Sequence, residues 1–336
     1  MLEGQLQYPR SIMSLCLLPN AITYYEPFGT KIAYMLPTTK KMRIMGLKKT
    51  FTSSPSFWYN SIWPYCSPQS TGQYQVLINK AVDLLSMNSK QSLQAFHNWH
   101  QYLSLHPEIH PIDPLTKCQE WLTREDFVHN LSECLNTELL GIKFRVPFQV
   151  KLNKKSDIEG LPIEFPVIIK ANSASVTKMS HIMSLVFNRQ GLKEAVGLYE
   201  EDCVVQEFIN HDMTVYKVYV IGSQVEYKPR VSCSNVSYSS KDCVTFNSAE
   251  PWPEDLKSGA RVVKDLSKPA LLEATQRISS HLGLSIFGYD ILVHSQTEDY
   301  IVVDVNVFPG FKEYPNLNPL LENHLKASLP NTENSH

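Results

Sequence analysis

The sequence has no excess of charge of one sign and no long apolar run. Lysine and arginine together number 31 against 33 aspartates and glutamates, which gives a formal net charge of −2. This balance creates no general field that would collect nucleic acid or an anionic membrane, so any anion must be bound by local clusters of basic residues. No stretch approaches the roughly 20 apolar residues that a membrane helix requires. We therefore expect neither nucleic acid nor a membrane as a partner.

Signals for secretion and for paired cysteines are also missing. The apolar stretch 11–18 follows Glu3 and is interrupted at Pro19 without a clear small-residue cleavage site, which disfavours a signal peptide. The seven cysteines are scattered and include no CxxC pair, so neither a zinc site nor a redox disulfide is expected. Both absences favour a cytoplasmic protein with reduced thiols.

A chain of 336 residues exceeds the size at which one hydrophobic core grows efficiently, which predicts two or three subdomains around one cleft. From Tyr74 onward, short apolar runs alternate with segments of helical periodicity, and this alternation predicts an α/β or α+β protein. We expect strands at 32–36, 76–78, 146–148, 165–170, 183–187, 203–208, 216–221, 285–293 and 300–308. We expect helices at 86–104, 115–140, 191–196 and 267–283, and a loop at 53–72.

The last two expected strands are joined by residues 294–299, which is short enough for an antiparallel hairpin. With the centre of the hairpin near Thr297, Asp290 and Asp304 lie directly across from each other. Side chains in such a pair share one face, with Cβ atoms about 4.5 to 5.5 Å apart. Because side chains alternate along a strand, Asn306 is expected on the face of Asp304. The apolar residues of the same strand are expected on the opposite face: Val303, Val305 and Val307.

Three oxygen-bearing side chains, from Asp290, Asp304 and Asn306, therefore converge on one face of the hairpin. Magnesium favours oxygen ligands and is normally held by one or two carboxylates together with phosphates and water. The simpler alternative is a polar face that is merely hydrated, as antiparallel sheets often are. Two directly opposed carboxylates repel each other unless a cation lies between them, and this favours the magnesium site.

Three segments could contact a nucleotide. Lys170 ends the apolar run 165–170, although a lysine at a strand end is usually an ordinary surface residue. Residues 172–181 are rich in small and hydroxyl side chains that could lay backbone N–H groups over phosphates, but they include no glycine. Residues 203–209 read as a buried strand that runs into a linker, where an adenine could bond to backbone edges. Each segment alone is also compatible with a purely structural role.

Taken in order, these segments resemble the inositol 1,3,4-trisphosphate 5/6-kinase family, also called the inositol-tetrakisphosphate 1-kinases. The resemblance runs from about Tyr74 to about Leu329. It is carried by Phe-Pro-Val-Ile-Ile-Lys at 165–170, by Phe-Gly-Tyr-Asp at 287–290 and by Asp-Val-Asn-Val-Phe-Pro-Gly at 304–310. Further matching segments lie at 79–80, 106–108, 113–115, 180–181, 204–211, 216–218 and 246–248.

The resemblance implies an α/β (α+β) protein of the ATP-grasp fold, with three subdomains around a central nucleotide cleft. It implies a monomeric kinase that uses ATP and two magnesium ions to phosphorylate a soluble inositol polyphosphate. His181 and Lys217 are the implied catalytic residues, with His181 as an electrostatic contact to the transferring phosphate and no evident general base. The implied ATP contacts are Lys170, Gln206, Glu207, Phe208, Ile209, Lys217 and Ser232. The implied substrate contacts are Lys40, Lys80, Arg124, His181, Arg230, Asn306, Gly310 and Lys312.

Several single residues keep a simpler interpretation. Arg124 could be a charge on a helix surface, His181 could be a structural histidine, and the basic run at 40–49 could be a solvated helix face. The chain also departs from the family at Ser175 and Val176, where a glycine is usual, and a glycine is what allows a backbone to approach phosphates closely. Residues 1–73 differ from the family's first βαβ unit as well.

These departures leave two alternatives to a kinase. One is a non-catalytic binder of inositol phosphates, and the other is an ATP-grasp carboxylate-amine ligase, which would share the metal hairpin. The expected organisation is an irregular segment at 1–30, an N-terminal subdomain at 31–113 and a central ATP-grasp subdomain at 114–204. A C-terminal ATP-grasp subdomain at 205–328 and a tail at 329–336 complete the chain.

Overall fold

The computed structural model describes most of the chain from residue 76 onward. The described residues are 31–35, 58–61, 76–87, 90–117, 122–156, 158–173, 178–236, 241–311, 314 and 317–328. They form three sheets and a set of helices, so the prediction of a mixed α/β protein is confirmed. None of the helices in these ranges is both long and apolar enough to cross a membrane.

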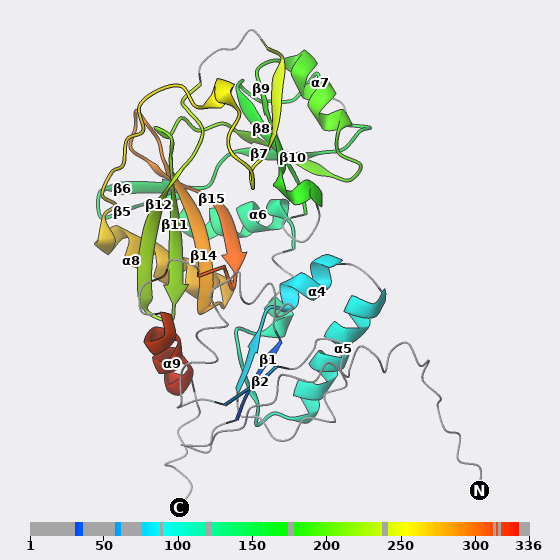
Figure 1. The fold of residues 1–336 in the computed structure, drawn as a ribbon, viewed down its shortest axis with the longest axis vertical. Helices are drawn as coiled ribbons and strands as arrows, with labels where there is room; N and C mark the ends of the chain where they lie inside the picture. The colour runs from blue at the N-terminus through cyan, green and yellow to red at the C-terminus, as the bar shows by residue number, and fades with distance from the viewer. Residues whose placement is uncertain are drawn as a thin grey trace, which may run out of the picture.

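The first sheet is parallel and has the strand order β2-β1-β3-β4. Its strands are β1 (Lys31–Met35), β2 (Trp58–Ser61), β3 (Val76–Asn79) and β4 (His110–Ile112), and the helices α4 (Ala81–Met87) and α5 (Lys90–Leu105) follow β3. Figure 1 shows this unit at one end of the molecule. The strand β2 falls inside the segment 53–72, so the prediction that this whole segment is a loop is wrong.

The second sheet is antiparallel, has the order β13-β9-β8-β10-β7 and lies at the other end of the molecule (Figure 1). Its strands are β7 (Gln149–Leu152), β8 (Val167–Ala171), β9 (Ile182–Val186), β10 (Cys203–Glu207) and β13 (Cys243–Asn247). The helix α7 (Arg189–Gly197) packs against it, and the short 3₁₀ helices η3 (Lys178–His181) and η4 (Glu254–Leu256) lie in its connections. The strand β7 begins three residues after the position expected for it at 146–148.

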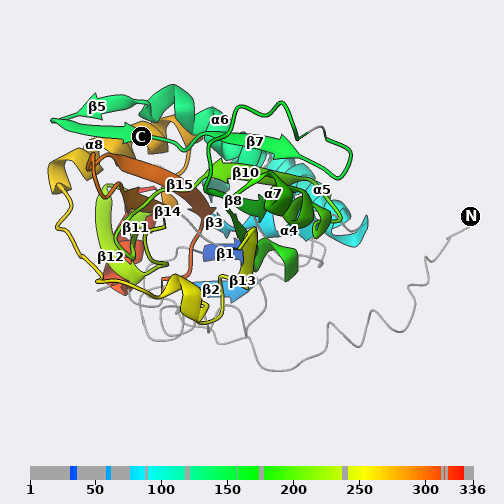
Figure 2. The ribbon, with the colours of Figure 1, turned by 90° about the horizontal axis from the view of Figure 1, so that it is seen from above.

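The third sheet has six strands in the order β12-β11-β14-β15-β6-β5. They are β5 (Thr137–Leu139), β6 (Ile142–Arg145), β11 (Thr214–Ile221), β12 (Gln224–Val231), β14 (Ile286–Val293) and β15 (Tyr300–Val307). The helices α6 (Arg124–Leu135), α8 (Lys268–Leu282) and α9 (Leu317–Ala327) pack around it. Figure 1 shows all three helices, and Figure 2 shows α6 and α8 beside the sheet.

Two of the predicted helices can be compared with the structure in detail. The helix α8 has Ser267 as its N-cap and Gly283 as its C-cap in the left-handed conformation, as the sequence predicts. The helix expected at 115–140 ends too late, because β5 begins at Thr137. Among the described residues of this segment, 115–117 form a 3₁₀ turn and Arg124–Leu135 is the α-helix. The segment 86–104 is divided between α4 and α5.

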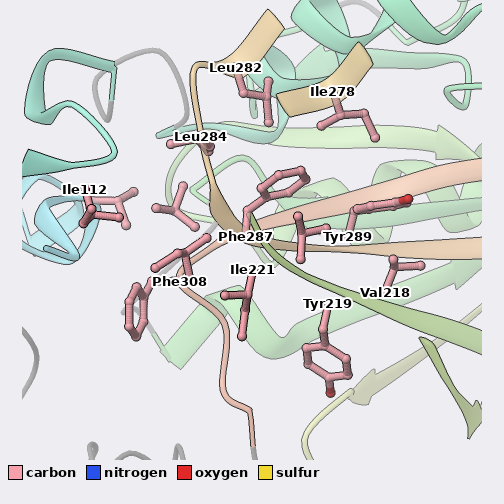
Figure 3. Close-up of a cluster of buried hydrophobic side chains, with 14 of the residues drawn as sticks. Ile112, Val218, Tyr219, Ile221, Ile278, Leu282, Leu284, Phe287, Tyr289 and Phe308 are labelled. Atoms are coloured by element: carbon pink, nitrogen blue, oxygen red, sulfur yellow. The ribbon is translucent and has the colours of Figure 1, made fainter. Parts of the chain in front are cut away.

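The buried apolar side chains form three separate clusters. The largest joins the parallel sheet to the six-stranded sheet, and Figure 3 shows Ile112 of β4 beside Leu284, Phe287 and Phe308. The other two clusters cover the two faces of the five-stranded sheet, one of them beneath α7. Because no apolar cluster of the described residues spans the five-stranded and six-stranded sheets, other contacts must set the angle between them.

Gly191 in α7 offers a test of the packing around the five-stranded sheet. A Cβ atom at Gly191 would lie 2.0 Å from the main-chain oxygen of Asp242, whereas one at Gly197 in the same helix would meet nothing within 4 Å. We expect Gly191→Ala to destabilise the fold by about 1–3 kcal/mol through overpacking. Gly197→Ala, the matched control, should be neutral or slightly stabilising. Thermal unfolding checks this, and equal midpoints for the two variants would contradict it.

Candidate active site

The hairpin of β14 and β15 places its two aspartates as the sequence predicts. Asp290 is paired with Asp304 in the antiparallel ladder, and Gly288 is paired with Asn306. Beyond Asp290 the register shifts by one residue, since Ile291 pairs with Val302. Val303 is therefore the extra residue of a β-bulge, and the prediction that it shares a face with Val305 and Val307 is wrong.

The bulge explains how one strand serves both a core and a polar face. Before it, Val302 belongs to the large apolar cluster; after it, Val305 and Val307 do. An uninterrupted strand would alternate strictly and would turn Asp304 toward the same side as Val302. The additional residue reverses this parity and re-aims the side chains that follow, a common use of bulges near functional sites. Asp304 and Asn306 consequently lie on the polar face.

A row of charged residues crosses four strands of the six-stranded sheet. Lys217 of β11 is paired with Asp290 on one side and with Lys228 of β12 on the other. The Nζ atom of Lys217 lies 2.8 and 3.1 Å from the two carboxylate oxygens of Asp290. Asn306 Nδ2 lies 3.5 Å from Asp304 Oδ2. The row thus runs from two cations to two carboxylates.

At the carboxylate end of this row, the negative charges of Asp290 and Asp304 repel each other. Burial raises the pKa of Asp290, the adjacent Lys217 ammonium opposes that rise, and the Asp304 carboxylate adds to it. Burial also disfavours the charge of Lys217, but Asp290 outweighs this effect and the pKa of Lys217 is raised. A cation between Asp290 and Asp304 would relieve the repulsion of the two carboxylates.

The donor set at this position suits magnesium. Two carboxylates and the amide oxygen of Asn306 would supply oxygen ligands on one face, and phosphate or water would complete the shell. In the described ranges, no three or more His, Cys, Asp or Glu side chains gather into a metal-binding group. Because of its oxygen donors, the carboxylate pair with Asn306 is the candidate metal centre that we consider further.

The facing five-stranded sheet contributes a buried lysine. Lys170 of β8 is 8% exposed, and its Nζ donates to Oε1 of Gln206 on the neighbouring strand at 2.8 Å. The pKa of Lys170 is lowered to about 8, chiefly by burial and also by the charge of Arg124, whereas Asp304 and Asp290 oppose the fall. Both aspartates act electrostatically on Lys170, so the three charges lie near one another although they belong to different sheets.

The segment that follows β10 is held by polar contacts. His211 is buried, and burial lowers its pKa. Its Nδ1 lies 2.5 Å from the main-chain oxygen of Ile209, and its Nε2 lies 2.7 Å from the hydroxyl of Ser232. A neutral imidazole fits both contacts, with Nδ1–H donating to Ile209 and Nε2 accepting from Ser232. The sequence motifs indicated Ile209 and Ser232, but not that His211 joins them.

The remaining implied substrate residues are placed differently. Arg124 is 5% exposed and donates through Nη1 to the main-chain oxygens of Ala171 and Ser173, so it is not a charge on a helix surface. His181 is exposed at the end of η3. Lys80 follows β3 directly, and Arg230 lies on β12 two residues from Lys228.

Some predicted features lie outside the described residues: Lys40, Lys312, Ser175 and Val176. Lys228 was not predicted, although it alternates with Arg230 in a charged strand, and this alternation is a signal that could have identified it.

Comparison with known proteins identifies the family. The model of the inositol 1,3,4-trisphosphate 5/6-kinase ATP-grasp domain matches residues 142–327, which is more than half of the chain. The chain belongs to this family. It is 28% identical over 285 residues to the inositol-tetrakisphosphate 1-kinase of Xenopus laevis, covering 80% of this chain and 70% of the relative. It is 29% identical over 282 residues to the Danio rerio enzyme of the same name, covering 78% and 69%.

Solved structures agree with the family on the fold. The D-alanine–D-alanine ligase of Bacillus anthracis superposes with a TM-score of 0.55 at 13% identity, covering 89% of this chain and 97% of the ligase. At this identity the likeness shows the fold alone. The ATP-grasp prediction is therefore confirmed, and the membership of the family rests on the sequence match.

Lys170 gives the site a testable pH dependence. A lysine with a pKa of about 8 loses its charge as the pH rises through that value. We expect affinity for ATP to fall by about tenfold between pH 7 and pH 9, since one pH unit above the pKa corresponds to a factor of about ten. Isothermal titration of ATP measures this.

Lys170→Arg is the matched control, because a guanidinium keeps its charge throughout this range. Lys217, whose pKa is raised, also stays charged. An equal fall in the wild type and in Lys170→Arg would contradict the assignment of the titrating group to Lys170.

Proposed function

We propose that this protein is an ATP-dependent kinase that transfers phosphate to a hydroxyl of a soluble inositol polyphosphate. The observation that carries the proposal is the juxtaposition of Lys170 on one sheet with the row Lys217, Asp290 and Asp304 on the other. Phosphoryl transfer depends mainly on positioning and on cations around the phosphates, and little covalent chemistry is required of the protein. The arrangement supplies what such a reaction needs.

The residues divide into groups with different tasks. Lys170 would contact the phosphates of ATP, and the main chain of 206–209 would bond to the edge of the adenine, with Ser232 nearby. Two magnesium ions held by Asp290, Asp304 and Asn306 would neutralise charge on the transferring phosphate. Lys217 would stand beside the reacting groups, since it already lies 2.8 Å from Asp290. His181 would act as an electrostatic contact and not as a proton acceptor.

The substrate would be bound by cations, since a polyphosphate needs lysine and arginine partners. Lys80, Arg230 and Lys228 would serve this purpose, and Lys228 joins the set because it adjoins Lys217 in the ladder. Arg124 would act by holding Ser173, since its guanidinium donates to the main-chain oxygen of that residue. The remaining proposed contacts are His181, Asn306, Gly310, Lys40 and Lys312. We further propose that the protein is a cytoplasmic monomer.

The experiment incubates the protein with ATP, magnesium and a panel of inositol phosphates and separates the products. A new phosphorylated inositol supports the kinase. Tight binding of inositol polyphosphate without turnover would overturn it in favour of a non-catalytic binder. The test matters because Ser175 and Val176 stand where the family usually has a glycine. ADP and phosphate released only with an amino acid would overturn it in favour of a ligase.

A further inference from the structure

One ion pair of the described chain spans the two sheets that enclose the candidate nucleotide site. Arg145 is the last residue of β6 in the six-stranded sheet, and Glu207 is the last residue of β10 in the five-stranded sheet. The Nη1 atom of Arg145 donates to Oε1 of Glu207, and Nη2 lies 3.5 Å from Oε2. The two residues are 62 positions apart in the sequence.

The Glu207 side chain is occupied by this contact and by the main chain. Its carboxylate accepts a hydrogen bond from the amide of Phe148 at 2.8 Å, and its own amide donates to the carbonyl of Phe148 at 2.9 Å. Glu207 was predicted as an ATP contact, but these bonds turn its carboxylate toward β6 and the start of β7. Since its amide is also bonded to Phe148, only the main-chain carbonyl of Glu207 remains suited to an adenine.

Arg145 also contacts the hairpin that carries the carboxylates. Its Nε lies 3.8 Å from Asp299, the residue before β15. The side chains of Arg145, Glu207 and Asp299 are 23%, 31% and 15% exposed, so the group is partly shielded from water. Partial shielding and a two-pronged arginine contact make such a pair stronger than an ordinary surface ion pair.

The strands that pair with β6 and β10 connect the Arg145–Glu207 ion pair to the candidate active site. The strand β6 pairs with β15, which carries Asp304, and β10 pairs with β8, where Val204 lies opposite Lys170. No apolar cluster of the described residues joins the two sheets. An open groove of about 760 Å³ adjoins Arg145, Phe148 and Glu207, so packing does not replace the ion pair there.

We propose that Arg145 is a positioning residue for ATP that acts by holding Glu207. It fixes the end of β10 against the six-stranded sheet and, together with the bonds of Arg124 to Ala171 and Ser173, sets the separation of Lys170 from Asp290 and Asp304. A displacement of about 1 Å at a reacting centre lowers rate or affinity substantially, even when the altered residue touches no substrate. This inference rests on the proposed use of ATP.

Arg145→Gln removes the charge and should weaken binding of a non-hydrolysable ATP analogue with magnesium by about tenfold, or roughly 1.4 kcal/mol. The KM for the inositol phosphate should change less than the affinity for the analogue, because Lys80, Lys228 and Arg230 lie on or beside two sheets that share one core and keep their mutual position. A general loss of structure would move both quantities and the unfolding temperature together. Arg145→Lys should recover part of the affinity.

Lys143→Gln is the matched control, since Lys143 lies on the same strand, contacts the same Asp299 at 3.7 Å and does not touch Glu207. It should bind the analogue as the wild type does. Glu207→Gln should reproduce the effect of Arg145→Gln, and the double variant should be no worse than either, because the pair acts as one unit.

The inference is overturned if Arg145→Gln binds the analogue normally, or if the two single effects add in the double variant. A wild-type protein that binds no nucleotide would overturn the proposed function and this inference together. If the wild type binds nucleotide and phosphorylates an inositol phosphate, and Arg145→Gln binds the ATP analogue as tightly as the wild type does, only this inference would be overturned.

Discussion

Asp304→Ala is expected to lower phosphoryl transfer by roughly a thousandfold, the equivalent of about 4 kcal/mol of transition-state stabilisation. Asp304 faces Asp290 across the ladder and lies beside Asn306. Its removal would leave one carboxylate, and that carboxylate is already paired with Lys217 at 2.8 Å. The remaining donors would hold magnesium poorly. The rate of product formation with ATP, magnesium and an inositol polyphosphate measures the loss.

Thermal unfolding separates this effect from a loss of structure. Magnesium with ATP should stabilise the wild type by mass action and should stabilise Asp304→Ala much less. Without metal, the variant should unfold at the same or a slightly higher temperature, because directly opposed carboxylates repel each other. Asp265→Ala removes an exposed carboxylate from the loop before α8 and should change neither quantity. Transfer within tenfold of the wild type would contradict the assignment of Asp304.

Asp113→Ala is expected to destabilise the protein by about 3 kcal/mol. Asp113 ends the parallel sheet and is 8% exposed, and its carboxylate accepts three hydrogen bonds from the start of β14. The donors are the Ser285 amide at 2.6 Å, the Ser285 hydroxyl at 2.7 Å and the Ile286 amide at 3.0 Å. The Ser285 hydroxyl also contacts His324 of α9 at 2.9 Å. One carboxylate thus joins three separate parts of the chain.

The expected magnitude follows from the donors that would be stranded. Burial raises the pKa of Asp113, and the three hydrogen bonds oppose that rise without cancelling it. Alanine would leave the buried amide of Ile286 and the half-buried amide of Ser285 unpaired, and each unpaired buried group costs about 1–3 kcal/mol. A loss of about 3 kcal/mol corresponds to a fall of roughly 6–12 °C in the unfolding midpoint.

Glu108→Ala is the matched control for Asp113. Glu108 lies in the same subdomain, its side chain is 55% exposed, and it contacts His106. Its removal should change the midpoint by less than about 1 °C, since exposed ion pairs contribute little. An Asp113→Ala midpoint within 2 °C of the wild type, on the other hand, would mean that the stranded amides find other partners.

Much of the candidate site could be predicted because its signals are local. Asp290 and Asp304 lie on adjacent strands joined by a short turn, so symmetry about Thr297 was enough to pair them. The helix α8 was delimited by its own caps, Ser267 and Gly283. Lys170 and the segment 206–209 were indicated by apolar runs and by the family resemblance. In each of these cases the relevant physics operates within about twenty residues.

Other parts of the site depend on neighbours that sequence spacing does not reveal. The bulge at Val303 lets β15 bury apolar side chains on one face of the sheet and present polar side chains on the other. Which face is buried depends on the elements packed against the sheet. Lys228 adjoins Lys217 because β12 pairs with β11, and Lys170 finds Gln206 because β8 pairs with β10. Which strands pair depends on the packing of the whole sheet and not on the sequence of a single strand.

The sequence by itself determined the class of fold and the pair of carboxylates, since residue types and short-range alternation suffice for these. The family followed from the resemblance of its motifs. Only the tertiary structure decided which cations face that pair and what holds the sheets that carry them. Arg145 meets Glu207 across 62 residues, and Asp113 meets Ser285 across 172. Contacts at such separations form only when distant segments fold against one another, so no local pattern records them.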